Sequence, residues 1–147
     1  RKMIAPINQN IYGIKKSEIT DLNQILNNKD HFNFFLKIDI ENHEYRILDQ
    51  IIKYQTRLTG LVIEFHDVDL HFEKIKEFIN KLDLQLVHIH VNNFGSINIQ
   101  NIPTVIEATF SPSTYNMLRE SNENKFPVNG LDQPNNKKEI DEPIIFE

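Results

Sequence analysis

Short apolar runs and segments of helical spacing alternate along this chain. The first clear run extends from Phe34 to Ile40, is rich in aromatic and β-branched residues and contains neither Gly nor Pro, which is the composition of a strand buried on both faces. The next apolar residues repeat at helical spacing and are Ile47, Leu48, Ile51 and Ile52. They predict a helix that ends near Tyr54, and Glu44 heads its apolar stripe instead of facing solvent.

A second strand and helix follow in the same order. Leu61–His66 is another apolar run that finishes in polar groups, and it predicts a strand parallel and adjacent to the first. The helix after it has one apolar face, made of Phe72, Ile75, Phe78, Ile79 and Leu82. Asp69 stands just before this face, so we expect it to cap the N-terminus of the helix.

Two further strands complete the predicted sheet. In Leu84–Val91 side chains alternate between the two faces, which places His88 and His90 on the same face. Thr104–Phe110 is reached without an intervening helix, so it is predicted to run antiparallel to its neighbour. The pattern as a whole predicts a three-layer α/β fold whose mixed sheet has an antiparallel last strand.

The two ends of the chain have weaker patterns. Residues 1–16 are predicted to form an extended lead-in with a short strand at Ile11–Ile14. A short amphipathic helix is expected to begin at Ser17, and its apolar residues are Ile19, Leu22, Ile25 and Leu26. Residues 112–147 are irregular and rich in Pro and Asn, and we expect much of this tail to be mobile, with Ile144–Phe146 able to add a short strand.

Composition narrows the possible partners. A length of 147 residues suits one domain with its own core, and a net charge of −5 without a long basic cluster argues against nucleic acid. The chain has no cysteine and no apolar run long enough for a membrane span, which favours a reducing cytoplasm. It starts with Arg1, and its opening residues follow no periodic pattern, so we expect a piece of a longer protein.

Ionisable side chains gather where the first two predicted strands end. Asp39 and Glu41 lie two residues apart, as do Glu64 and His66, so each pair can share one face of the sheet. Ligands of open α/β sheets bind beyond the carboxyl ends of the strands. These four groups could orient a substrate hydroxyl, accept its proton or hold a divalent cation. A structural reading instead pairs Asp39 with Lys37 or a helix N-terminus and Glu64 with a backbone amide.

The segment around the first of these acids resembles the signature of a known family. Lys37, Ile38, Asp39, Glu41 and Glu44 match, position by position, the Lys-Ile-Asp-x-Glu-Gly-x-Glu sequence of FkbM-type methyltransferases. These enzymes depend on S-adenosylmethionine and have a Rossmann-like sheet.

Two residues depart from the signature. Asn42 replaces the usual glycine, and Asn is the residue that best tolerates a positive φ after Gly. His43 replaces a small residue and brings a bulky titratable group beside the acids.

The resemblance implies that residues 17–111 are the C-terminal portion of a Rossmann-like methyltransferase domain that methylates an oxygen of a polar metabolite or saccharide. Ile63–His66 resembles the Ile-Glu-x-His ending of the corresponding strand, and His90–Asn93 resembles a His-x-Asn-Asn segment at the mouth of the pocket. Leu131–Asn135 is similar to a closing segment of some relatives, which favours a packed tail. The implied site residues are Asp39, Glu41 and His66 for catalysis and Glu44, Glu64, His90 and Asn93 for substrate binding.

The glycine-rich turn that a Rossmann-type cofactor site needs is missing from this sequence. The glycines are Gly13, Gly60, Gly95 and Gly130, which are never clustered. Cofactor-binding residues therefore cannot be assigned here, and we expect the chain alone to bind S-adenosylmethionine weakly and to be inactive.

Other functions remain open from the residues alone. The strand-end acids with His66 could serve a divalent-metal enzyme, or the chain could be a non-catalytic half-domain for binding or assembly. His88 and His90 have the spacing of two metal ligands, although polar residues on the outer face of a sheet have the same spacing. As the first strand of a half-domain, Phe34–Ile40 would expose an edge through which the chain could self-associate.

Overall fold

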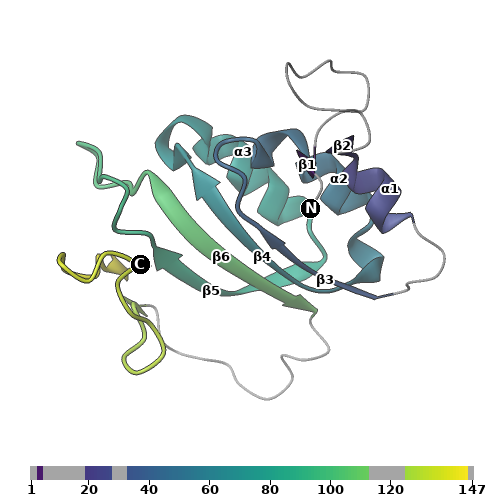
Figure 1. Ribbon diagram of the computed structural model, residues 1–147. Helices are drawn as coiled ribbons and strands as arrows, with labels where there is room; N and C mark the ends of the chain where they lie inside the picture. The colour runs from purple at the N-terminus through teal and green to yellow at the C-terminus, as the bar shows by residue number, and fades with distance from the viewer. Residues whose placement is uncertain (1–2, 5–18, 28–32, 113–124, 146–147) are drawn as a thin grey trace.

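The computed structural model describes residues 3–4, 19–27, 33–112 and 125–145 of the chain. At its centre is a four-stranded mixed sheet with the order β3-β4-β6-β5 (Figure 1). Its strands are β3 Phe34–Ile38, β4 Leu58–His66, β5 Leu84–Val91 and β6 Val105–Pro112. The prediction of an α/β fold with a mixed sheet is confirmed.

Strand directions follow from how the strands are connected. β3 and β4 are joined through helical turns and run parallel, with Ile38 opposite Ile63. β6 follows β5 across a loop without a helix, and it pairs antiparallel with both β4 and β5. The parallel first pair and the antiparallel last strand were both predicted. β6 lies inside the sheet, so β5 and β3 form its two edges.

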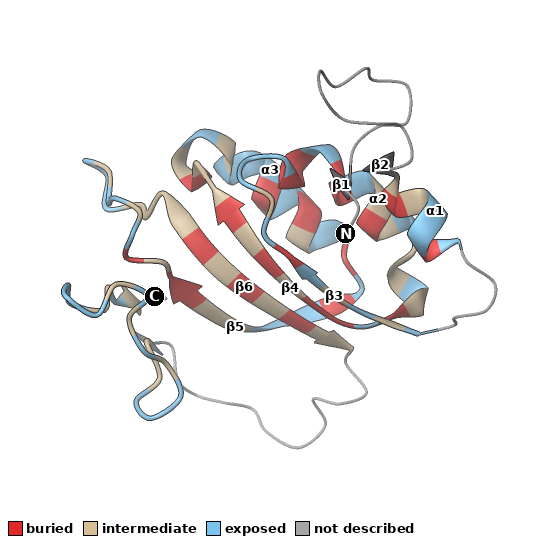
Figure 2. Ribbon diagram, in the orientation of Figure 1, coloured by how far each residue is buried: buried red, intermediate tan, exposed pale blue. Residues whose placement is uncertain are grey.

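The helical elements share one core on one face of the sheet. They are α1 Leu22–Leu26, α2 Leu48–Lys53, α3 Val68–Lys81 and two short 3-10 turns, Glu44–Arg46 and Gln55–Arg57. On the sheet side, alternate residues of β4 and β6 face this core, including the fully buried Phe65 and Phe110 (Figure 2). Phe78 of α3 packs edge-on against both of these rings. This packing holds the carboxyl ends of β3 and β4 in place.

Two short strands of the tail, β7 Lys125–Phe126 and β8 Ile144–Ile145, pair antiparallel with each other. They lie beside β5 (Figure 1), where tail residues contact the sheet face opposite the helices, as in the hydrogen bond between His88 and Asp132. The expected short strand at the end of the chain is therefore confirmed. The three-layer expectation is met only in part, because the described helices cover one face and irregular chain covers part of the other.

A further pair of short strands lies near the N-terminus. β1 Met3–Ile4 pairs parallel with β2 Ile19–Thr20. The strand predicted at Ile11–Ile14 lies outside the described residues. The first helix begins at Leu22 and not at Ser17, because the side chain of Asp21 caps it by accepting a hydrogen bond from the Asn23 amide at 2.9 Å.

Three expectations drawn from local patterns are wrong. β3 is not buried on both faces, since it is an edge strand in which Lys37 is exposed and only Ile38 is buried. Asp69 does not cap α3, because that helix already begins at Val68. Asp69 instead lies in the first turn of α3, where the helix dipole favours a negative charge. Phe72 was placed on the apolar face of α3 but is half exposed.

No described helix combines the length and the apolar character that crossing a membrane requires.

Candidate functional site

A tight turn follows β3 and presents the first acids. The amide of His43 donates to the carbonyl of Ile40 at 3.2 Å, and the two residues between them have positive φ, 52° at Glu41 and 70° at Asn42. Asn tolerates this conformation, as the sequence predicted, and its side chain also donates to Asp67 at 2.7 Å. Glu tolerates it poorly. Strained backbone of this kind is enriched at functional sites, where the surrounding structure compensates for the strain.

His66, the last residue of β4, is held in place by a buried carboxylate. Oε1 of Glu44 accepts hydrogen bonds from the His66 amide at 2.7 Å and from Nδ1 of its ring at 3.1 Å. Glu44 is fully buried, which confirms that it faces inward from the helical stripe. Because Nδ1 faces Glu44, the other ring nitrogen, Nε2, points away from Glu44 and toward Glu41.

Tyr45 supports the same strand end. Its hydroxyl donates to the carbonyl of His66 at 2.5 Å, and its ring lies against His71 with the centroids 4.0 Å apart. Burial raises the pKa of Tyr45, and the negative charge of Glu44 raises it further, so the hydroxyl stays protonated as a donor. Glu44 and Tyr45 thus fix the position of His66 from two directions.

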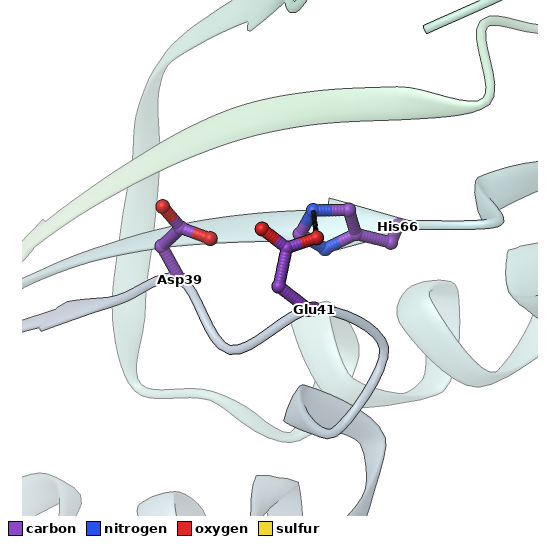
Figure 3. A group of neighbouring side chains, drawn as sticks. All are labelled: Asp39, Glu41 and His66. Atoms are coloured by element: carbon purple, nitrogen blue, oxygen red, sulfur yellow. Dashed lines mark ion pairs between the residues drawn. The ribbon is translucent and has the colours of Figure 1, made fainter.

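Asp39, Glu41 and His66 come together in space. Each offers one potential ligand atom, and these atoms all lie within 4.8 Å of one another (Figure 3). Nε2 of His66 is 3.4 Å from Oε2 of Glu41 and 4.0 Å from Oε1 of Glu64. Asp39 and Glu41 are exposed, while His66 is largely buried. The predicted convergence at the carboxyl ends of two parallel strands is confirmed, and it creates a site open to solvent on one side.

Glu64 connects this cluster to the residue that follows β5. Its Oε1 accepts a hydrogen bond from the side chain of Asn92 at 2.6 Å. Burial raises the pKa of Glu64, and the charge of Asp39 adds to this rise, whereas the hydrogen bond from Asn92 and the nearby His66 lower it. The contact that the sequence assigned to a backbone amide is therefore made by a side chain.

His90 and Asn93 lie farther along the sheet and contact the tail. Nε2 of His90 is 2.9 Å from Oδ1 of Asp141, and Nδ1 is 3.7 Å from Oε2 of Glu107. The side chain of Asn93 donates to the carbonyls of Asn136 and Ile140 at 3.1 and 3.2 Å and accepts from the Asn136 amide at 2.7 Å. The structure does not bring either residue into the Asp39 cluster, and substrate contact by them stays a prediction.

The neighbouring His88 is also paired with the tail. Its Nε2 is 2.8 Å from Oδ1 of Asp132, and its ring packs edge-on against Phe126. His88 and His90 do share one face, as predicted. Each ring contacts a different aspartate, so the two imidazoles are not arranged around a common ion, and the one metal-compatible cluster found within the described residues is at Asp39.

Sequence reasoning missed Asn92, Glu107 and Asp141. Asn92 had one available signal, since it directly precedes Asn93 at a predicted strand end. Glu107 and Asp141 had none, because their partners lie on other segments of the chain and only the strand register and the path of the tail bring them together.

Comparisons with protein-family models, with curated proteins and with solved structures find no match to this chain. The assignment of a function therefore rests on the residues and the geometry described above.

Proposed function

We propose that this chain forms part of an S-adenosylmethionine-dependent methyltransferase that methylates an oxygen of a polar metabolite or saccharide in the cytoplasm. One observation carries the proposal. Asp39, Glu41 and His66, three residues of the resemblance to the FkbM family, converge within 4.8 Å at the carboxyl ends of two parallel strands. This edge of an α/β sheet is where ligands bind.

In this proposal His66 is the general base. Glu44 holds the ring with Nε2 directed toward the open cluster, so Nε2 can accept the proton of a substrate hydroxyl. Asp39 and Glu41 are exposed acceptors that can hydrogen-bond neighbouring hydroxyls and stabilise the imidazolium that forms. These residues bind and deprotonate the methyl acceptor.

The described residues do not provide a cradle for the cofactor. Gly60 lies within β4, Gly95 is packed against Thr104 and Val105, and Gly130 stands alone in the tail. A phosphate or carboxylate site formed by closely spaced glycines is therefore not present in the described chain. We assign no cofactor contact to it, and the proposal places those contacts elsewhere in the protein.

Methyl transfer by the polypeptide of the complete gene, measured with radiolabelled S-adenosylmethionine and a panel of saccharides and polar hydroxyl compounds, tests the proposal. His66→Ala should lower kcat at least about 100-fold, the usual loss when a general base is removed. Asp39→Asn should also reduce the rate, whereas Asp49→Asn, an equally exposed aspartate on α2, should not. The proposal is wrong if the complete polypeptide does not bind S-adenosylmethionine or if His66→Ala retains full activity.

A divalent-metal enzyme is the second candidate, and a specific observation favours it. A carboxylate that fixes a histidine through one ring nitrogen while the other nitrogen faces two further acids is the usual surrounding of a metal-binding histidine. This arrangement is found at His66: Glu44 fixes the ring through Nδ1, and Asp39 and Glu41 lie on its other side.

Calorimetric titration with Mg²⁺ and Mn²⁺ distinguishes the two candidates. A metal site predicts binding of one ion that Glu41→Gln weakens at least tenfold and that Glu73→Gln, an exposed acid on α3, leaves unchanged. Methyl transfer that persists in a strong chelator would exclude a metal-dependent reaction. If neither Mg²⁺ nor Mn²⁺ binds, the metal candidate is wrong and the general-base role of His66 is kept.

A further inference from the structure

A cavity of about 450 Å³ opens at the end of β5, away from the Asp39 cluster. The loop after β5 forms one side and the tail forms the other. Its lining includes Val91, Asn93, Phe94, Ile97, Glu139 and Glu142. No residue of the proposed catalytic cluster lines it, so the cavity needs its own explanation.

The two walls are fastened to each other. Asn93, which is 9% exposed, makes three hydrogen bonds to the backbone of Asn136 and Ile140. Beside it, the contact between His90 and Asp141 holds the tail next to Glu142. The contacts join residues more than 40 positions apart, for example 43 between Asn93 and Asn136. The cavity is therefore formed by specific tertiary contacts and not by one loop alone.

One wall exposes apolar surface. The ring of Phe94 is 73% exposed and Ile97 is 41% exposed, and both line the cavity. An exposed aromatic ring at the mouth of a pocket provides a flat apolar face, on which the CH face of a sugar ring or a cationic group can stack. Isolated apolar residues on a surface are common, but these two line the same cavity and together offer an apolar contact surface to a ligand.

The other wall carries negative charge. Glu139 and Glu142 line the cavity, and within the part of the chain that the structure describes no ion pair joins either of them to a basic side chain. The whole chain also has a net charge of −5. Aromatic and carboxylate groups together favour a ligand that combines a ring with an amine over a neutral or an acidic ligand.

Hydrogen bonds connect the cavity to the catalytic cluster. Asn92, the residue before Asn93, donates its side-chain amide to Glu64 and its backbone amide to Val105, and Val105 is paired with His66 across β4 and β6. The end of β5 therefore lies two strand spacings, or roughly 10 Å, from the end of β4 along the same edge of the sheet. One extended ligand of a few sugar rings could reach both.

We infer that this cavity binds an amine-bearing sugar unit of an oligosaccharide, with the sugar stacked on Phe94 and its ammonium group next to Glu142. The inference rests on the proposed function in one respect, because it identifies the oligosaccharide as the methyl acceptor whose neighbouring sugar reaches His66. The binding itself requires neither cofactor nor metal.

The experiment is a titration of the ¹⁵N-labelled 147-residue chain with two matched tetrasaccharides, followed by NMR. One is a tetramer of glucosamine, which carries amines, and the other is the tetramer of N-acetylglucosamine, which has the same backbone without charge. We expect the amide resonances of the loop after β5 and of residues 136–142 to shift with the glucosamine tetramer, and the acetylated tetramer to bind at least tenfold more weakly.

Two pairs of variants separate stacking from charge. Phe94→Ala should weaken binding of the glucosamine tetramer at least tenfold, whereas Phe72→Ala, an exposed phenylalanine on α3, should not. Glu142→Gln should weaken it at least threefold, and Glu73→Gln on the same helix as Phe72 should not. Equal effects of Glu142→Gln and Glu73→Gln would show unspecific attraction to a negative chain and would overturn the inference, as would tighter binding of the acetylated tetramer.

The result is independent of the methyltransferase assay. Binding at Phe94 in a protein that never transfers methyl groups would refute the proposed function and keep the sugar site. Methyl transfer to an acceptor that does not shift the loop after β5 would refute the sugar site and keep the proposed function.

Discussion

The ionisation of Glu64 illustrates what a single residue contributes to this site. Burial raises its pKa from the ordinary value of 4.5, with a further rise from the charge of Asp39, so Glu64 binds its proton more tightly in the folded chain than in the unfolded one. The free energy of unfolding therefore falls as the pH rises through the interval above about 4.5, because the folded state must give up a proton that the unfolded state has already lost.

Glu64→Gln should remove this penalty. The amide oxygen of glutamine can still accept the hydrogen bond from Asn92, while the charge is lost. We expect the stability of the variant relative to the wild type to be greater at pH 7 than at pH 4. Urea unfolding at both pH values measures this difference. Glu73→Gln on the exposed face of α3 serves as the control. A gain that is equal at the two pH values would contradict the role assigned to ionisation.

Glu44 is fully buried, and its Oε1 accepts two hydrogen bonds from His66. Glu44→Ala would leave the amide and ring donors of His66 without an acceptor, which should lower the free energy of unfolding by about 1–3 kcal/mol. Glu44→Gln, which keeps one acceptor oxygen, should cost less. Denaturant unfolding of both variants tests this, and equal losses would show that the retained acceptor oxygen and side-chain volume of glutamine contribute nothing, which would contradict the role assigned to these hydrogen bonds.

At the scale of single residues, steric rules and helical spacing predicted part of the site. The positive φ of Asn42 followed from its place in the signature, and the inward position of Glu44 followed from helical spacing. The contact between Glu44 and His66 did not follow from either rule. It depends on how close the 3-10 turn comes to the end of β4, which no local pattern encodes.

At the scale of elements, the apolar runs predicted the strands but not their neighbours. The composition of Phe34–Ile40 is that of a central strand, yet β3 lies at an edge, where its burial alternates along the strand. Composition reports the β tendency of a segment, while burial depends on what packs against it. The same limit applies to β6, whose antiparallel direction was predictable from its short connection but whose place between β4 and β5 was not.

The pairing of Phe35 with Gly60 across β3 and β4 can be measured. A Cβ added at Gly60 would lie 2.8 Å from the ring of Phe35, which covers the glycine. Gly60→Ala should therefore cost about 1 kcal/mol with Phe35 present, although alanine is otherwise preferred to glycine in a strand by roughly 0.5–1 kcal/mol. In the Phe35→Ala background the same change should be neutral or stabilising. Identical effects in both backgrounds would exclude this coupling.

At the scale of the whole molecule, the tail was the part least accessible to sequence reasoning. Residues 125–145 are rich in Pro and Asn, which predicted mobility, and only a likeness to a closing segment favoured packing. The structure attaches the tail through the pairs His88 with Asp132 and His90 with Asp141, which are 44 and 51 residues apart. Contacts between residues so far apart in the sequence follow from the complete fold, and local patterns do not predict them.

Asp141→Ala tests how much this attachment contributes. The largely buried His90 would lose the partner at its Nε2, so we expect the free energy of unfolding to fall by about 1–3 kcal/mol and amide hydrogen exchange to accelerate around Ile140. Glu139→Ala, an exposed neighbour, should change neither quantity. Faster exchange without a loss of global stability would show that the tail opens as a separate unit.

The exposed edge of β3 leads to a prediction about assembly. β3 is an edge strand in the described sheet, and Phe35 is 64% exposed on it, so another strand can pair there. Lys37 is exposed on the same short strand and opposes such pairing, and we therefore expect weak self-association that increases with concentration. Phe35→Lys should abolish it in analytical ultracentrifugation, whereas Phe72→Lys on α3 should leave it unchanged.

The same measurement on the polypeptide of the complete gene separates assembly from catalysis. If further strands of a methyltransferase sheet pair with β3, they occupy its free backbone groups, and the complete polypeptide should no longer associate through this edge. A half-domain that serves as an assembly module would instead keep the edge available, and Phe35→Lys would then dissociate the complete polypeptide as well. A chain that stays monomeric at every accessible concentration would contradict assembly through β3, because the edge would then be too short and too charged to pair.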